Sequence, residues 1–169
     1  MAFVGIEKDA FPSWHDGARI FVLCAAIFFV PLLFSQQLIA GTLVNAMLVY
    51  SALKIRGNWS YAPAVIPSVA AMLAGVLFGA VHAVLIMLPF IWLGNMALIF
   101  IMKKMGAMKD YYKILLGSAI VKTAIISVSC LSLVYFAGLP SGLMQNFTYL
   151  QLITAILGGI LANLFISKV

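Results

Sequence analysis

Acidic residues are scarce in this sequence. Only 8% of its 169 residues are charged, and Asp and Glu together number four. The four acids, Glu7, Asp9, Asp16 and Asp110, all fall outside the long apolar runs. A pump that carries protons on a carboxylate inside the membrane is therefore disfavoured, because such a pump needs an acid within its spans.

Residues for catalysis or metal binding are missing as well. The two cysteines, Cys24 and Cys130, stand alone in apolar segments, whereas iron–sulfur clusters and structural zinc sites need several thiolates. There is no glycine-rich phosphate loop, no pair of carboxylates and no histidine cluster, and His82 is expected to be solvated in an outer turn. We therefore expect no enzyme activity, no catalytic residue, no bound metal and no cofactor.

Apolar residues are what the sequence has in excess. They make up 65% of the chain, whereas a soluble domain is usually about half apolar. A soluble fold of this length could not bury so much apolar surface, so lipid must surround it. The composition predicts an all-α fold, a polytopic integral membrane bundle that forms a single transmembrane domain over residues 1–169.

Six apolar runs have a length suited to membrane-crossing helices, which need about 20 residues. We expect these spans near residues 18–34, 38–53, 64–80, 83–102, 111–137 and 147–167, and an interfacial N-terminal segment over residues 1–17. Two connections, 35–37 and 79–82, are very short. A tight helical hairpin explains each of them, and one long tilted helix, giving five spans or four, is the alternative.

The basic residues other than Lys122 all lie on one side of this six-span arrangement, in its connections or near the ends of its spans. They are Lys8, Arg19, Lys54, Arg56, Lys103, Lys104, Lys109, Lys113 and Lys168. The three connections on the other side, 35–37, 79–82 and 138–146, contain no Lys or Arg. The positive-inside rule then predicts that both termini are cytoplasmic. A net charge of +6 could indicate a protein that binds nucleic acid. The position of the basic residues between apolar runs argues against nucleic acid as a partner.

Small residues recur at a spacing of four in two spans. The pattern comprises Ala70 and Ala74, then Ala71, Gly75, Gly79 and Ala83, and in the last span Ala155 with Gly159 and Gly158 with Ala162. Such spacing lets helix backbones approach closely in lipid. We expect packing within the bundle, and a docking face for a partner membrane subunit is the alternative.

Lys122 is the one charged residue deep inside a predicted span. An ionisable group in the membrane is a candidate for function because its insertion costs about 3 kcal/mol. Three outcomes stay open: a neutral amine, a side chain that reaches back to the cytoplasmic surface, or an ammonium that faces a polar cavity.

Five further polar or aromatic residues lie at a similar depth or nearer the outer side: Asn45, Trp92, Asn95, Gln151 and Thr154. Each of them alone is best explained as a contact between helices, but several together favour a ligand site. We predict that these five line one cavity with Lys122. Lys122 would provide the charge for an anionic ligand, the amides would orient it, and Trp92 would stack on its apolar part.

Three segments carry a family resemblance: Gly41–Ala46 (GTLVNA), Leu88–Asn95 (LPFIWLGN) and Gln151–Gly159 (QLITAILGG). They resemble small six-span prokaryotic proteins of the energy-coupling factor (ECF) transporter S-component type. This resemblance implies a multi-pass protein of a prokaryotic cell membrane, with six helices, cytoplasmic termini and a ligand pocket toward the outer side. It also implies a transmembrane coupling subunit and two ATPases as partners. The family's first outer loop usually forms a lid, and residues 35–37 are shorter than such a lid.

Together these features predict a substrate-binding membrane subunit for the uptake of a small molecule, either vitamin-like or another small, anionic solute. Because the sequence has no nucleotide site, the energy for uptake would come from partner subunits or from gradients. The alternative is a structural or assembly subunit of a larger membrane complex, in which Lys122 pairs with another chain. The expected partners are membrane lipid, the ligand, and the coupling subunit with its ATPases.

Overall fold

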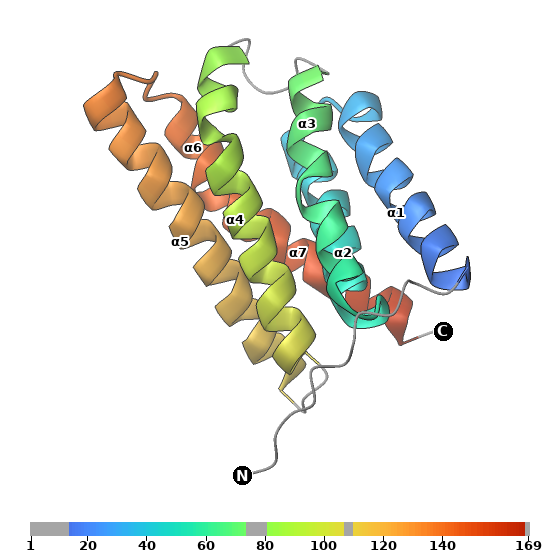
Figure 1. The fold of residues 1–169 in the computed structure, drawn as a ribbon. Helices are drawn as coiled ribbons and strands as arrows, with labels where there is room; N and C mark the ends of the chain where they lie inside the picture. Colours follow the sequence, from blue (N-terminus) through green and yellow to red (C-terminus); the bar gives the residue numbers. More distant parts are fainter. Residues whose placement is uncertain (1–13, 74–80, 107–109, 168–169) are drawn as a thin grey trace.

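The structure is a computed structural model that describes residues 14–73, 81–106 and 110–167, without the side chains of residues 81–84. Within these ranges every regular element is a helix. The elements are α1 (Trp14–Leu33), α2 (Gln37–Lys54), the 3-10 helix η1 (Asn58–Ala64), α3 (Ile66–Leu73), α4 (Val81–Met105), α5 (Tyr111–Ala137), α6 (Leu143–Phe147) and α7 (Tyr149–Ile166). Figure 1 shows them as one bundle.

Four stretches of the described residues are long and apolar enough to cross a membrane. They are Trp14–Leu33, Leu85–Met105, Tyr111–Ala137 and Leu143–Ile166, and each overlaps a predicted span. Helix α2 also forms at its predicted place, but Gln37, Asn45 and Lys54 reduce its apolar character. The predicted span 64–80 coincides only in part with α3, because residues 74–80 lie outside the described ranges. The all-helical fold is confirmed, whereas the count of six spans stays a prediction.

Large apolar side chains face outward along the whole bundle. Phe21, Leu33, Val128 and Phe136 are each more than half exposed. Water would disfavour so much exposed apolar surface, and lipid would not. The surface is therefore that of a membrane protein.

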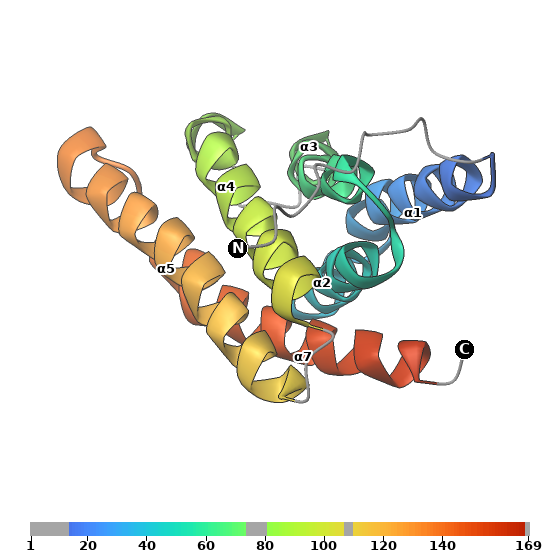
Figure 2. The same ribbon diagram turned by 60° about the horizontal axis from the view of Figure 1, so that its bottom comes forward.

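Helix α2 lies at the centre of the bundle. It packs against α1, α4, α7 and η1, while α5 lies at the edge and packs against α4, α6 and α7. Figure 2 shows α2 between α7 on one side and α1, α3 and α4 on the other. The central position of α2 lets its polar residues face several other helices at once.

Helices α1, α3 and α5 run in one direction, and α2, α4 and α7 run in the other (Figure 1). As a result, the N-terminal ends of α1 and α5 and the C-terminal ends of α2, α4 and α7 lie at one end of the bundle. We call it the basic end, because Arg19, Lys54, Lys103 and Lys113 belong to these helix ends. The connections from α1 to α2 and from α5 to α6 lie at the opposite end.

Two apolar clusters form the core, and polar residues separate them. One cluster contains Leu98, Met102 and Leu115, and the other contains Ile91 and Ile126. Cys130 belongs to the second cluster as a buried free thiol. Between the clusters lie Asn95 on α4 and Lys122 on α5, which are both 2% exposed.

The small residues of α7 let it pack closely on its neighbours. A Cβ atom added to Gly158 would lie 2.6 Å from Cβ of Asn45 and 2.7 Å from the backbone N of Ala46, so only glycine fits against α2. Gly159 leaves room in the same way for Leu115 of α5. This part of the small-residue pattern serves packing within the chain, as predicted. Ala74, Gly75 and Gly79 lie outside the described residues.

Candidate functional site

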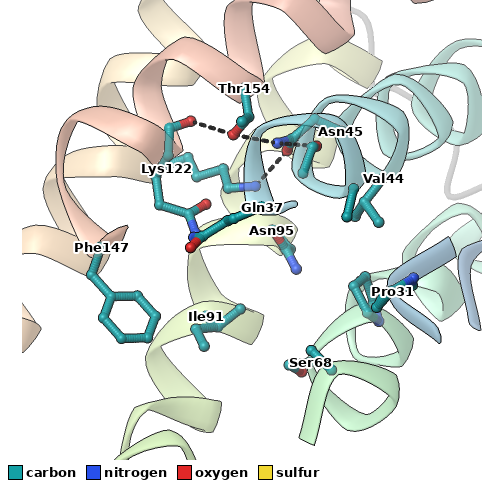
Figure 3. A pocket seen from close by; sticks show the side chains of 15 residues that line it. Pro31, Gln37, Val44, Asn45, Ser68, Ile91, Asn95, Lys122, Phe147 and Thr154 are labelled. Carbon is teal, nitrogen blue, oxygen red and sulfur yellow. Dashed lines mark hydrogen bonds between the residues drawn. The ribbon is translucent and has the colours of Figure 1, made fainter. Parts of the chain in front are cut away.

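A cavity of about 100 Å³ lies inside the bundle, and each of the α-helices α1 to α7 contributes at least one lining residue (Figure 3). Its polar lining residues are Gln37, Asn45, Ser68, Asn95, Lys122, Gln151 and Thr154. Most of the remaining wall is apolar, and it includes Val44, Ile91 and Phe147. Five of the six predicted site residues therefore meet at one cavity.

Lys122 points into this cavity and not toward the basic end. It is 2% exposed, and its Nζ donates a hydrogen bond of 2.5 Å to Oδ1 of Asn45. Of the three outcomes left open for Lys122, the side chain that reaches back to the cytoplasmic surface is not the one observed, because Asn45 holds the amine inside the bundle. In its protonated form the amine has three N–H donors, so two of them remain for another acceptor.

No carboxylate faces Lys122 within the described residues. The two acids in these ranges are Asp16 and Asp110. Asp16 lies 4.0 Å from Arg19, and Asp110 lies 3.2 Å from Lys113, in both cases near the start of a helix at the basic end. The cavity therefore has an amine without an acidic partner from the described chain.

Asn45 fixes the position of the amine. Its Nδ2 donates to the carbonyl oxygen of Gly41 at 2.9 Å and to Oγ1 of Thr154 at 3.2 Å. The hydroxyl of Thr154 donates in turn to the carbonyl oxygen of Leu150 at 2.8 Å. Because both Nδ2 bonds orient the amide, its oxygen is left to face Lys122. Asn45 thus connects α2, α5 and α7 at the cavity wall.

Asn95 and Gln151 have unused hydrogen-bonding groups at the cavity. Nδ2 of Asn95 donates to the carbonyl oxygen of Ala64 at 2.8 Å, while its Oδ1 accepts no hydrogen bond from the described residues. The side-chain amide of Gln151 is half-buried and makes no hydrogen bond within the described residues. Both side chains can therefore bind a polar group in the cavity.

Trp92 does not line the cavity, so the predicted stacking of Trp92 on the ligand has no support here. Its Nε1 donates to Oγ of Ser68 at 2.7 Å, which joins α4 to α3. Ile91 and Asn95, four residues apart, share the face of α4 that lines the cavity. Trp92 lies about 100° around the helix from Ile91, and this rotation turns its ring away.

The sequence-based prediction missed Gln37 and Ser68. Gln37 lies in the predicted connection 35–37, but it is the first residue of α2, and its Nε2 donates to the carbonyl oxygen of Asn146 at 3.2 Å. Ser68 is a single hydroxyl in an apolar run, and no spacing pattern distinguishes it. Only the packing of α3 against α4 shows that Ser68 belongs to the cavity wall.

The chain matches no protein-family model, no curated protein and no solved structure. Its function is therefore inferred from the chemistry of this cavity. A fixed amine, free amide groups and apolar walls are suited to binding a small polar solute.

Proposed function

We propose that the chain is the substrate-binding membrane subunit of an uptake system for a small anionic solute. The observation that carries this proposal is the buried amine of Lys122, which has two unused N–H donors beside a cavity. A buried ammonium without a counter-ion costs several kcal/mol, and a bound anion would offset this cost. The anion-loaded form is therefore the more stable one.

The topology that we propose has six spans, with both termini in the cytoplasm. The alternating helix directions and the basic end of the bundle support it, because Lys and Arg favour the cytoplasmic side. Under this topology Gln37 and Phe147, at the opposite end, lie near the outer surface. The solute would then enter the cavity from outside.

Cysteine labelling tests this topology. Cys24 and Cys130 are first replaced by Ala, and single cysteines are then introduced by Lys104→Cys at the basic end and Ser141→Cys at the other. Both positions are exposed. A membrane-impermeant reagent added to intact cells should label position 141 and leave position 104 unlabelled. Labelling of position 104 from outside would rule out the proposed orientation.

For the energy of uptake we propose a transmembrane coupling subunit and two ATPases as partners. The resemblance of three segments to ECF S-components supports this, together with the lack of a nucleotide-binding motif in the sequence. Purification from native membranes in mild detergent should recover the chain with ATPase subunits. Recovery in a stable larger complex without ATPases would instead favour the assembly role.

Mass spectrometry of the protein extracted from its native membrane tests the binding function itself. The wild-type chain and a Lys113→Met variant should retain the same small solute, because Lys113 is exposed at the basic end. A Lys122→Met variant keeps the length of the side chain and removes the charge, and it should lose the solute. Equal retention by the wild type and Lys122→Met would contradict the proposal.

A further inference from the structure

We infer that the ligand is a small hydroxy-monocarboxylate, whose carboxylate binds Lys122 and whose hydroxyl binds Asn95. This inference rests on the proposed binding function and narrows its substrate class. It follows from four features of the cavity: its single charge, its free donors, its free acceptor and its size (Figure 3).

The charge of the cavity selects a monoanion. Lys122 is the only ionisable residue among the lining residues that the structure describes. A neutral solute would leave its ammonium without a counter-ion, and a dianion would add a second, uncompensated charge to a low-dielectric site. One negative charge balances the site.

The free donors match a carboxylate. Nζ of Lys122 has two N–H groups left after its bond to Asn45, and the unused amide of Gln151 lines the same cavity. An ionised carboxylate offers two oxygens that only accept hydrogen bonds, and such charge-assisted bonds are stronger than neutral ones.

The free acceptor requires a donor on the ligand. Oδ1 of Asn95 accepts no hydrogen bond from the described residues, although the residue is 2% exposed. A ligand that fills the cavity and gives this oxygen no hydrogen bond would bind more weakly than one that does. A hydroxyl supplies the donor, whereas a second ammonium would repel Lys122.

The cavity has room for a ligand of only a few carbon atoms. Its volume of about 100 Å³ is well below the roughly 300–1,000 Å³ of pockets for drug-sized molecules. Apolar side chains such as Val44, Ile91 and Phe147 can cover a short carbon chain. Of the two substrate classes predicted from the sequence, the small anion therefore fits better than a vitamin-sized molecule.

Calorimetry on the full chain in lipid nanodiscs tests this inference with four probes: lactate, lactamide, propionate and inorganic phosphate. Lactamide has the shape of lactate without its charge, so its affinity should be at least about 100-fold lower. Propionate lacks the hydroxyl and should bind about tenfold more weakly than lactate. Inorganic phosphate should not compete. Lactamide binding within threefold of lactate, or tighter binding of phosphate, would overturn the inference.

An Asn95→Leu variant gives a second, independent measurement. It should lower the affinity for lactate to that of propionate and leave propionate binding unchanged, whereas a purely structural defect would weaken both. Equal selectivity in the variant and the wild type would contradict the role of Asn95. The comparison of lactate with lactamide on the wild type needs no variant, so it stands even if Asn95→Leu does not fold.

The same data separate this inference from the proposed function. If no probe binds while the extracted wild type still retains another solute that Lys122→Met loses, the monocarboxylate is wrong and the binding function stands. If no probe binds and no solute is retained, both proposals fail.

Discussion

Two lysines of this bundle have opposite surroundings. Lys103, in the last turn of α4 at the basic end, donates to the carbonyl oxygen of Gly57 and to Oγ of Ser60, and its Nζ lies 5.6 Å from the centre of the Tyr61 ring. Lys122, in the middle of α5, donates to Asn45 and otherwise faces the cavity. Both amines join two elements of the fold, but of the two only Lys122 lines the cavity.

This difference separates a structural lysine from a binding one. The contacts of Lys103 attach η1 to α4, where the charge can also reach the membrane surface. Lys122 has no such access, so its unused donors need a partner that the described chain does not provide. Burial beside a cavity, and not residue type, marks the candidate site.

Lys122→Met should produce the largest effect of any change considered. We expect solute binding to fall by at least about 100-fold, because two charge-assisted hydrogen bonds are lost. The free energy of unfolding in lipid should stay the same or rise, since a buried charge is removed. Titration with the retained solute and unfolding in mixed micelles measure the two quantities. A large loss of stability without a loss of binding would make Lys122 a structural residue like Lys103.

Gly158→Ala should lower the free energy of unfolding by about 1–3 kcal/mol, because the added methyl group overlaps Asn45 and the backbone of α2. Binding should weaken in the same variant, since Asn45 positions Lys122. Gly117→Ala is the matched control, because no atom lies within 4 Å of its added Cβ. That change should leave stability unchanged or raise it by about 0.5–1 kcal/mol. Equal effects at both glycines would contradict the close α2–α7 contact.

Lys103→Met should lower stability and leave solute binding unchanged, which is the opposite of what we expect for Lys122→Met. Loss of the contacts to Gly57 and Ser60 should lower the free energy of unfolding by about 1–2 kcal/mol, while solute affinity stays within twofold of the wild type. The two measurements are the same as for Lys122→Met. Weaker solute binding without lower stability would show that the basic end belongs to the site.

Trp92→Phe should have the smallest effect. It removes the hydrogen bond to Ser68 and keeps most of the ring, so we expect a stability loss of about 0.5–1.5 kcal/mol. Because Trp92 does not line the cavity, solute affinity should change by less than twofold. A tenfold loss of affinity would restore the stacking role predicted from the sequence.

Much of the fold could be predicted from the apolar runs. The range predicted for α5, 111–137, is the range observed, and α2 and α4 differ from their predicted bounds by at most a few residues. The structure of the region before α3 is harder to predict from the sequence, because η1 contains Trp59, Pro63 and two polar residues and has no long apolar run. Helix α6 lies in the predicted connection 138–146 except for Phe147, because its five residues are too few to show a helical period.

The sequence by itself determined that the chain is an all-helical membrane protein, where its long helices lie, and that Lys122 has no carboxylate near it along the chain. Composition and apolar run length carry this information, because lipid requires every spanning backbone group to bond within its own helix. Only the tertiary structure decided which faces meet. The rotation of each helix about its axis depends on contacts such as that of Gly158 with Asn45. The spacing of residues along one sequence does not reveal that angle. That rotation turned Trp92 away from the cavity, brought Ser68 to its wall, and aimed Lys122 at Asn45.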